Sequence, residues 1–574
     1  MKNSSILKSK TLNTNSLLKT ICKNRGVAEN ACQYDLKELQ SNWDHKDIAN
    51  CLELILKNID NKILIVSDCE IDSTMATVVL HKGLKKIQFP SVDFIVLHGI
   101  FEQHGLSEDQ AREIINSYNP SLVILVNRGY YYKDGFAYLK KHSVQTLLIS
   151  HSPLLCDLED KSFYINSFDR KHKDLSTALV CLHILTGLRS MMIQSKHPAL
   201  SSIDSLNFAN LLDFISLSIV SEYLQLDANN RILVHFGLKQ AKSDYANPSI
   251  QAMLERKLKS NDNFTAIDYL HELSMRIHAS AKLKDKSTAI QCLISEKREG
   301  ALDFQLKLQE VVDQKKYQKK LNRARILEII NKDIVSNPEF KQSDFIYFPE
   351  LDPKDITSIA SCLKDHLHKP TVVMTNLSSE LLIGAVKSIK GFNVYMIFLS
   401  ISKMYPGLVN RFGGFSTNLV FVINKQDLEK VKEVFHQQVD IMLGNYRGHH
   451  ELMVDGSLVD EFLSLECARF LKNISPWGVG FPEPNFEGTF HVISTRIVGA
   501  NHLKMMVNQD GGSQLHLSIL FNASNYVDVG KTIQTIRVIY KLDINETKKQ
   551  PECQLLFLKV MDVTYATNIE DEFK

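Results

Sequence analysis

Between about residues 60 and 170, short apolar runs alternate with longer stretches of helical spacing. The apolar runs are four to six residues long and rich in β-branched side chains: Ile63–Val66, Val92–Leu97, Leu122–Val126 and Thr146–Ile149. Helical stretches such as Glu108–Ser117 lie between them. Continuous apolar strands that alternate with helices predict a parallel sheet covered on both faces. Because such sheets bind ligands at the carboxyl ends of their strands, we look for candidate chemistry there.

The rest of the chain shows three further patterns. Residues 205–335 have mainly helical spacing, and within them 301–337 predicts a long helix that links two globular halves. Strand-like runs return between residues 344 and 440 and predict a second α/β unit. From about residue 485, alternating apolar and polar positions recur at close spacing. This last pattern predicts a small antiparallel barrel or sandwich.

Composition narrows the class of protein. At ~150 residues per domain, 574 residues correspond to about four units. The 44% hydrophobic and 23% charged residues exclude a disordered or collagen-like chain. Lys and Arg total 67 and Asp and Glu total 65, so any basic surface has to be local. Ten scattered cysteines without a Cys-x-x-Cys pair indicate a cytoplasmic protein with reduced thiols. No apolar run reaches the ~18–20 residues of a membrane span, so no membrane partner is expected.

Acidic side chains follow the first predicted strand at every second position: Asp68, Glu70 and Asp72. Alternate side chains of an extended segment point the same way, so the three carboxylates could converge on a divalent metal. Acids at strand-to-helix turns also cap helices. The pattern alone leaves both interpretations open.

Further polar residues follow the third and fourth predicted strands. Asn127 comes directly after the third strand, and Ser150, His151 and Ser152 end the fourth. A single histidine after a strand is more often structural than a metal ligand, so His151 also carries two interpretations. Another acid, Glu222, follows the apolar segment 211–220.

Distinctive motifs are spread over about residues 20–562. They include Arg25-Gly26-Val27, His104-Gly105-Leu106-Ser107, Leu226–Leu233, Met275–Ala279, Pro476-Trp477-Gly478, Gly480–Pro484, Val498–Lys504 and Tyr540–Glu546. In this order they resemble the RecJ family of the DHH phosphoesterase superfamily, whose members are single-stranded-DNA-specific 5′→3′ exonucleases.

The resemblance implies an α/β protein with four folded parts. These are a DHH-type parallel-sheet domain, a long connecting helix, a second α/β domain of the DHHA1 type and a C-terminal OB-fold β-barrel. On this sequence we place a basic N-terminal tail and lead-in at 1–46 and the DHH-like domain with its helical part at 47–300. The connecting helix is placed at 301–337, the DHHA1-like domain at 338–442 and the OB-fold domain at 443–574.

The resemblance also implies a catalytic site with two ions, Mn²⁺ or Mg²⁺, which activate water and stabilise the leaving oxygen of a phosphodiester. Family aspartates and a histidine motif hold these ions. On this sequence the implied metal ligands are Asp68, Glu70, Asp72 and Glu222, and His151 is the remaining catalytic histidine. Three family positions are altered, at Asn127, Ser150 and Ser152.

These replacements weaken the implied site for physical reasons. An amide lacks the charge of a carboxylate, glutamate is one methylene longer than aspartate, and Mg²⁺ demands tight ligand placement. Loss of supporting residues alone costs ~10–100-fold in metal affinity or activity. Gly99, Cys362, Lys387 and Phe415 replace arginines and a histidine that would grip phosphates. We therefore expect doubtful metal occupancy and an exonuclease activity that is weak or absent.

The basic and aromatic residues that remain predict binding of single-stranded DNA. An OB-fold groove spans ~4–16 nucleotides, and stacking on its aromatic side chains adds to affinity. Tyr540 is as compatible with a core position as with stacking, and the basic stripe from Lys315 to Arg325 is as compatible with a solvated helix face. The candidate nucleic-acid contacts are Arg276, Lys387, Arg496, His502, Lys504, Tyr540 and Lys541.

The sequence thus predicts a monomeric, RecJ-like protein of DNA repair or recombination that binds single-stranded DNA while its catalysis is weak or lost. One alternative is an active Mn²⁺-dependent exonuclease that tolerates Glu and Asn as ligands. Another is a non-catalytic scaffold that binds replication or repair proteins. A small-molecule phosphodiesterase of the same superfamily is disfavoured, because such enzymes generally lack an OB module.

Overall fold

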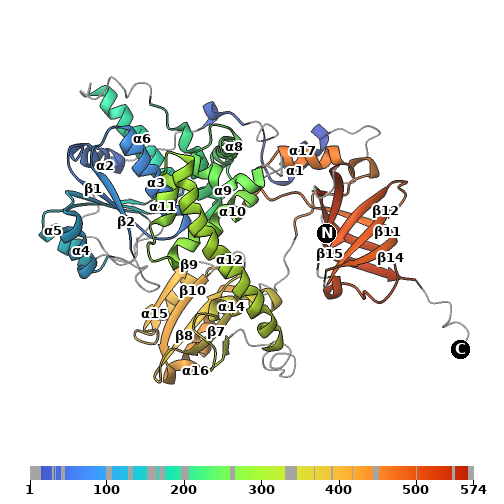
Figure 1. Ribbon diagram of the computed structural model, residues 1–574. Helices are drawn as coiled ribbons and strands as arrows, with labels where there is room; N and C mark the ends of the chain where they lie inside the picture. Colours follow the sequence, from blue (N-terminus) through green and yellow to red (C-terminus); the bar gives the residue numbers. More distant parts are fainter. Residues whose placement is uncertain are drawn as a thin grey trace, which may run out of the picture.

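Two α/β domains, a long helix between them and a β-barrel make up the molecule in the computed structural model (Figure 1). The barrel lies beside the first domain, and the long helix runs from the first domain to the second. The structure describes residues 14–28, 32, 34–39, 46–97, 106–126, 133–150, 164–166, 175–195, 206–258, 265–329, 345–367, 369–389, 392–415, 418–443, 452–499, 501–521, 523–545 and 550–566.

The first domain contains a parallel sheet of five strands in the order β2-β1-β3-β4-β5. This confirms the predicted parallel sheet and its four apolar strands. Side chains of β1 alternate between two buried clusters, with Ile63 and Ile65 on one face and Leu64 and Val66 on the other. The strands are β1 (Ile63–Ser67), β2 (Val92–Val96), β3 (Leu122–Val126), β4 (Gln145–Ser150) and β5 (Tyr164–Asn166).

Helices cover both faces of this sheet and extend it into a helical part (Figure 1). Among the described residues, α6 is the one helix long and apolar enough to cross a membrane, but half of that stretch is buried inside the protein. The helices are α2 (Lys46–Lys57), α3 (Ile71–Lys86), α4 (Glu108–Tyr118), α5 (Lys133–Lys141), α6 (Thr177–Gln194), α7 (Leu212–Ser221), α8 (Ala228–Lys242), α9 (Pro248–Leu258), α10 (Ala266–Ala279), α11 (Thr288–Ile294) and the connecting helix α12 (Arg298–Ile329).

The second domain is also α/β, with a mixed sheet in the order β6-β7-β8-β10-β9. Strands β6 and β7 are parallel, and the remaining pairs are antiparallel. Separate apolar clusters fill the two faces of the sheet. Its elements are β6 (Phe345–Tyr347), α14 (Ile356–Leu367), β7 (Thr371–Asn376), β8 (Leu381–Lys387), α15 (Val394–Met404), β9 (Arg411–Phe415), β10 (Asn418–Asn424) and α16 (Leu428–Leu443).

The C-terminal part is a closed five-stranded barrel in the order β11-β12-β13-β15-β14, which confirms the predicted barrel. Helix α17 packs on β14 and β15. The elements are α17 (Leu465–Asn473), β11 (Phe486–Val498), β12 (His502–Gln509), β13 (Leu515–Leu520), β14 (Ile533–Asn545) and β15 (Glu552–Tyr565).

The barrel and the first domain are joined by a buried ion pair that involves the N-terminal helix α1 (Thr14–Asn24). Arg25 follows this helix, and its Nη1 lies 2.5 Å from Asp455 Oδ1, with side-chain exposures of 1% and 0%. Its Nη2 also donates to Asp455 Oδ2 at 3.1 Å and to the Pro482 carbonyl at 2.7 Å. Leu17 and Ile21 of α1 are buried in the same apolar cluster as β1 and the barrel core.

Aromatic rings complete this joint, which we call the interdomain clasp (Arg25, Arg231, Asp455, Trp477 and Phe481). Trp477 and Phe481 stack with their ring centroids 5.0 Å apart. The guanidinium of Arg231, on α8, lies 3.9 Å from the centroid of Phe481, and that of Arg25 lies 5.5 Å from it. The family motifs at residues 25–27 and 476–484 therefore hold the domains together.

Candidate functional site

The turn between β1 and α3 carries two of the predicted acids at the carboxyl edge of the parallel sheet. The Asp68 carboxylate is 7% exposed, and its Oδ1 accepts a hydrogen bond from the Glu70 N–H at 2.9 Å. Glu70 is the N-cap residue of α3, but its side chain makes no capping hydrogen bond. Burial, and then the negative charges of Asp68 and Glu222, raise the pKa of the Glu70 carboxyl well above its usual value. Three of the four predicted acids therefore lie within electrostatic reach of one another.

The fourth acid, Asp72, lies in the first turn of α3 and is completely buried. Its Oδ2 accepts a hydrogen bond from the Thr177 N–H at 2.9 Å, and its Oδ1 accepts from the Ala178 N–H at 3.1 Å and the Ser218 hydroxyl at 2.5 Å. Thr177 and Ala178 begin α6, where backbone N–H groups have no partner within the helix and the helix dipole favours negative charge. Asp72 therefore caps α6 and links it to α3 and α7.

Other elements complete this acidic edge. Ser150 ends β4 and is completely buried. Glu222 is the half-buried C-cap residue of α7, and its N–H donates to the Ser218 carbonyl at 3.2 Å. The buried hydroxyl of Ser73 has no hydrogen-bond partner among the residues that the structure describes.

Only some of the residues predicted to hold a metal pair belong to the described part of the chain. Asn127, His151 and Ser152 lie outside the described residues. Among the described ones, no three His, Cys, Asp or Glu side chains are placed to hold a metal ion. Asp72 directs its oxygens to backbone and hydroxyl donors. The predicted two-ion ligand set therefore stays a prediction.

A second group of predicted residues lies where the helical part of the first domain approaches the second domain. Lys315 of α12 and Lys387 at the end of β8 both act electrostatically on His278 of α10. Desolvation by the surrounding chain, and then these two cations, lower the pKa of His278 to about 4. Arg276 is 8% exposed and pairs with Glu272 at 3.3 Å, so its guanidinium is engaged inside the domain. The structure thus brings Lys387 together with Lys315 and His278, across the two domains.

The barrel residues predicted to contact nucleic acid divide into exposed and buried ones. Arg496 of β11 is exposed and lies directly across from Lys504 of β12. The ring of His502 contacts Phe521 edge-on, with 5.1 Å between centroids. Lys541 pairs with Glu483 at 2.7 Å. Tyr540 is completely buried and packs against Phe490 in the barrel core. We therefore leave Tyr540 out of the candidate interface, because a buried ring cannot stack on a base.

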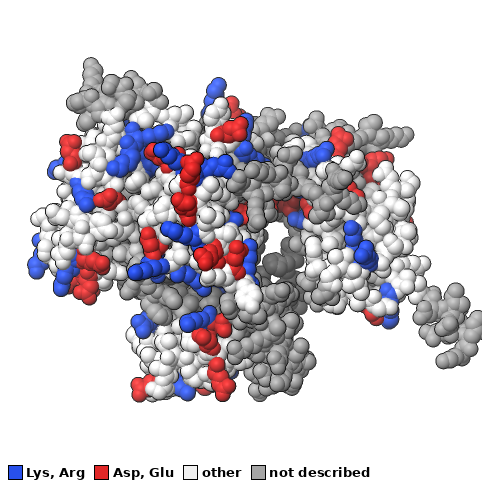
Figure 2. Space-filling view, in the orientation of Figure 1, with Lys and Arg blue, Asp and Glu red and all other residues white. Residues whose placement is uncertain are grey.

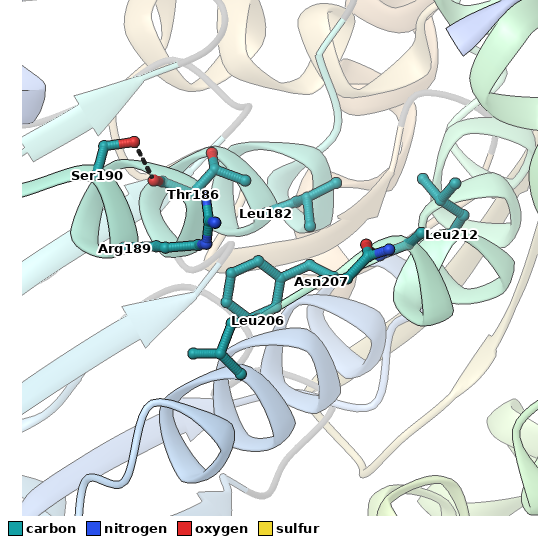
Figure 3. Close-up of a pocket in the computed structure, with 9 residues that line it drawn as sticks. Leu182, Thr186, Arg189, Ser190, Leu206, Asn207 and Leu212 are labelled. Carbon is teal, nitrogen blue, oxygen red and sulfur yellow. Dashed lines mark hydrogen bonds between the residues drawn. The ribbon is translucent and has the colours of Figure 1, made fainter. Parts of the chain in front are cut away.

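An open pocket of about 330 Å³ lies between residues 182–190 of α6 and residues 206–212 (Figure 3). Leu182 and Arg189 line it from α6, and Leu206 and Phe208 line it from the other side. This pocket could not be predicted from the sequence, because its two walls carry no motif.

Ser218 and Thr177 are the site residues that the sequence analysis missed. Both donate to Asp72, from positions more than 100 residues away in the sequence. The pair Ser176-Thr177 before an apolar helix is a recognisable N-terminal signal, and the Ser176 hydroxyl does accept from Leu179 N–H at 3.3 Å. That signal predicts the start of α6 but does not identify the buried carboxylate that caps it.

Comparisons with known proteins agree with this architecture. Residues 454–559 match the family model of the RecJ OB domain. The single-stranded-DNA-specific exonuclease RecJ of Haemophilus influenzae is 26% identical over 501 residues, covering 86% of this chain and 87% of the relative.

Solved structures extend the similarity to the whole chain. The crystal structure of RecJ from Thermus thermophilus in complex with Mn²⁺ has a TM-score of 0.70 at 16% identity and covers 97% of this chain and 79% of that one. The Mg²⁺ complex from the same organism has a TM-score of 0.64 at 15% identity, with 97% and 77% covered. At this identity the likeness concerns the fold. The OB domain, the relatives in sequence and the common fold together confirm the similarity of this chain to the RecJ family of the DHH superfamily.

Proposed function

We propose that this protein binds single-stranded DNA in DNA repair or recombination and that its exonuclease activity is weak or absent. The similar protein from H. influenzae is named for its specificity for single-stranded DNA, and the similar structures from T. thermophilus hold Mn²⁺ or Mg²⁺. Any ion that this chain binds would be one of these two. We place the protein in the cytoplasm, as a monomer that can associate with repair or replication proteins.

The observation that carries the loss of catalysis is the environment of Asp72. An ionised carboxylate has about four acceptor positions, and donors occupy three of those of Asp72. A metal ion would compete with these donors for the carboxylate, and displacing them would leave the N–H groups of Thr177 and Ala178 without a partner in the protein interior. Each buried group left in that state costs ~1–3 kcal/mol. Ser150, at the end of β4, brings no charge to this edge, and Asn127 lacks the charge of the aspartate that the resemblance implies.

A second candidate function is a working Mn²⁺-dependent exonuclease. It is favoured by the negative charges of Asp68 and Glu222 near Glu70, which would attract a divalent ion.

A nuclease assay with a 5′-labelled single-stranded oligonucleotide in Mn²⁺ separates the two candidates. We expect salt-dependent binding without release of 5′ nucleotides. Release that disappears in the Asp68→Asn variant would instead establish the enzyme. Release that persists unchanged in that variant would indicate a contaminating nuclease.

Two lysines beside His278 at the domain boundary support the DNA-binding part of the proposal. His278, Lys315 and Lys387 come from three elements of two domains, so a strand between the domains would meet all three. Lys387→Ala should weaken oligonucleotide binding and reduce the slope of log affinity against log salt by about 0.7, the value for one phosphate contact on single strands. Lys403→Ala, at an exposed position on α15 of the same domain, is the matched control and should leave the slope unchanged.

A further inference from the structure

The second half of β11 is paired on one side only among the described residues. Residues 494–498 pair with β12, from Ser494 opposite Met506 to Val498 opposite His502. The pairing of β11 with β14, on its other side, ends at His491 opposite Thr535. We call residues Ile493–Val498 the β11 edge. A strand edge of this kind presents backbone N–H and C=O groups that can pair with another chain.

The β11 edge also extends the apolar interior of the barrel to the surface. Directly paired residues of neighbouring strands have their side chains on the same face, so Ile497 shares a face with Leu503, and Thr495 with Met505. Leu503 and Met505 are only 3% and 1% exposed, whereas Ile497 is 55% exposed. Ile493, at the β-bulge between Val492 and Ser494, is 60% exposed. One further strand beside β11 would cover this apolar row.

The opposite face of the same edge is cationic. Arg496 lies across from Lys504, and the chain contains no Asp or Glu between Gly488 and Gln509. The barrel surface visible in Figure 2 is mostly uncharged, with a few basic side chains on it and acidic ones at its margins. A strand beside β11 would therefore meet apolar positions at Thr495 and Ile497 and a positive charge at Arg496, between them.

We propose that the β11 edge binds an extended segment of another protein in which apolar and acidic residues alternate. Such a segment adds a strand to the barrel: its backbone pairs with β11, its apolar residues cover Ile497, and its acidic residues face Arg496 and Lys504. Nucleic acid fits this edge less well, because it has no peptide ladder and residues 493–498 carry no aromatic ring on which a base could stack. A second copy of this chain also fits less well, because it would bring two sets of Arg496 and Lys504 together. The proposal does not depend on nuclease activity.

Fluorescence anisotropy of a labelled peptide tests this proposal on the full-length protein. The probe is a synthetic peptide of about ten residues in which valine and glutamate alternate. We expect saturable binding that is at least about tenfold weaker in the Ile497→Glu variant, which removes apolar contact and repels the probe. Leu515→Glu is the matched control, because Leu515 is 58% exposed on the same barrel but lies on β13, and its affinity should stay within about twofold of the original.

A charge exchange keeps the test valid if Ile497→Glu folds poorly. Arg496 is exposed, so Arg496→Glu should fold normally. It should lose affinity for the valine–glutamate peptide and gain affinity for a valine–lysine peptide.

Three results would overturn the proposal. The first is equal binding by the original protein, Ile497→Glu and Leu515→Glu. The second is no peptide binding together with an oligonucleotide affinity that falls in Ile497→Glu, which would assign the edge to nucleic acid. The third is no peptide binding together with a dimer in light scattering that Ile497→Glu dissociates, which would assign the edge to a second copy.

Discussion

Replacing Asp455 with asparagine should loosen the barrel from the first domain at a cost of about 3–5 kcal/mol, the range for breaking a buried ion pair by removing one partner. Both side chains of the Arg25–Asp455 pair are essentially unexposed. Asp455 also accepts hydrogen bonds from Asn24 Nδ2 at 3.2 Å and from the Asn485 N–H at 3.2 Å. In the variant, the Arg25 guanidinium keeps its bonds to the carbonyls of Pro482 and Ile21 but stays buried without a counter-charge.

Tryptophan fluorescence during urea unfolding measures this effect at the clasp itself. The chain has two tryptophans, Trp43 and Trp477, and Trp477 lies 5.8 Å from the Arg25 guanidinium. A Trp43→Phe background leaves Trp477 as the single reporter. A local reporter is needed because a chain of several domains does not unfold in one two-state step. The expected result is a lower urea midpoint for the Trp477 transition in Asp455→Asn.

Two further variants decide whether the buried charge is the cause. Glu108→Gln breaks the exposed Arg112–Glu108 pair, whose side chains are both 53% exposed, and should cost at most ~1 kcal/mol. The double variant Arg25→Met/Asp455→Leu removes both buried charges and should lose less stability than Asp455→Asn alone. The reasoning is refuted if Asp455→Asn costs no more than Glu108→Gln, or if the double variant is the least stable of all.

Three other predictions concern the interior of the two α/β domains. Burial raises the pKa of Asp213 from 3.8 to about 6, so the folded protein holds this proton more tightly than the unfolded chain. The free energy of unfolding should therefore fall by ~3 kcal/mol as pH rises from 4 to 7. Asp213→Asn should remove this pH dependence in urea titrations repeated across the same range. Gly414→Ala should destabilise the second domain by ~1–3 kcal/mol in thermal melts, because φ is +144° and an added Cβ would lie 2.2 Å from the Asn418 carbonyl oxygen. Gly407→Ala is the control: φ is +88° there, but the added Cβ would lie in open space, so it should cost less. Millimolar Mn²⁺ should leave the melting temperature unchanged, because we expect no ion to bind at Asp68 and Glu70. A bound ion would stabilise the folded state, so a clear rise in melting temperature would show that these acids do hold a metal.

The sequence predicted four of the five strands of the first sheet, all but β5, because buried parallel strands are short, continuous and β-branched. It missed β8, where Gly384 interrupts the apolar run. The structure explains that glycine: an added Cβ would lie 2.4 Å from Phe421 Cζ, so the neighbouring ring occupies the space of a side chain. A local pattern cannot reveal a requirement set by a residue on another strand.

The candidate site was predictable in part for a similar reason. Residues on the β1–α3 turn are close in the sequence, so their convergence follows from the strand itself. The contact between Asp72 and the start of α6 depends on packing between segments 105 residues apart, which periodicity does not report. Tyr540 could not be assigned either, because a tyrosine suits an apolar interior and a polar surface equally well.

The clasp imposes an order on the biosynthesis of this protein. Arg25 emerges from the ribosome early, but its partner Asp455 follows 430 residues later. At roughly 5–20 residues per second, Arg25 waits about 20 to 90 s before Asp455 has been made. During this interval its guanidinium has neither Asp455 nor the Pro482 carbonyl as a partner, so the joint between the barrel and the first domain can form only after most of the chain has been synthesised.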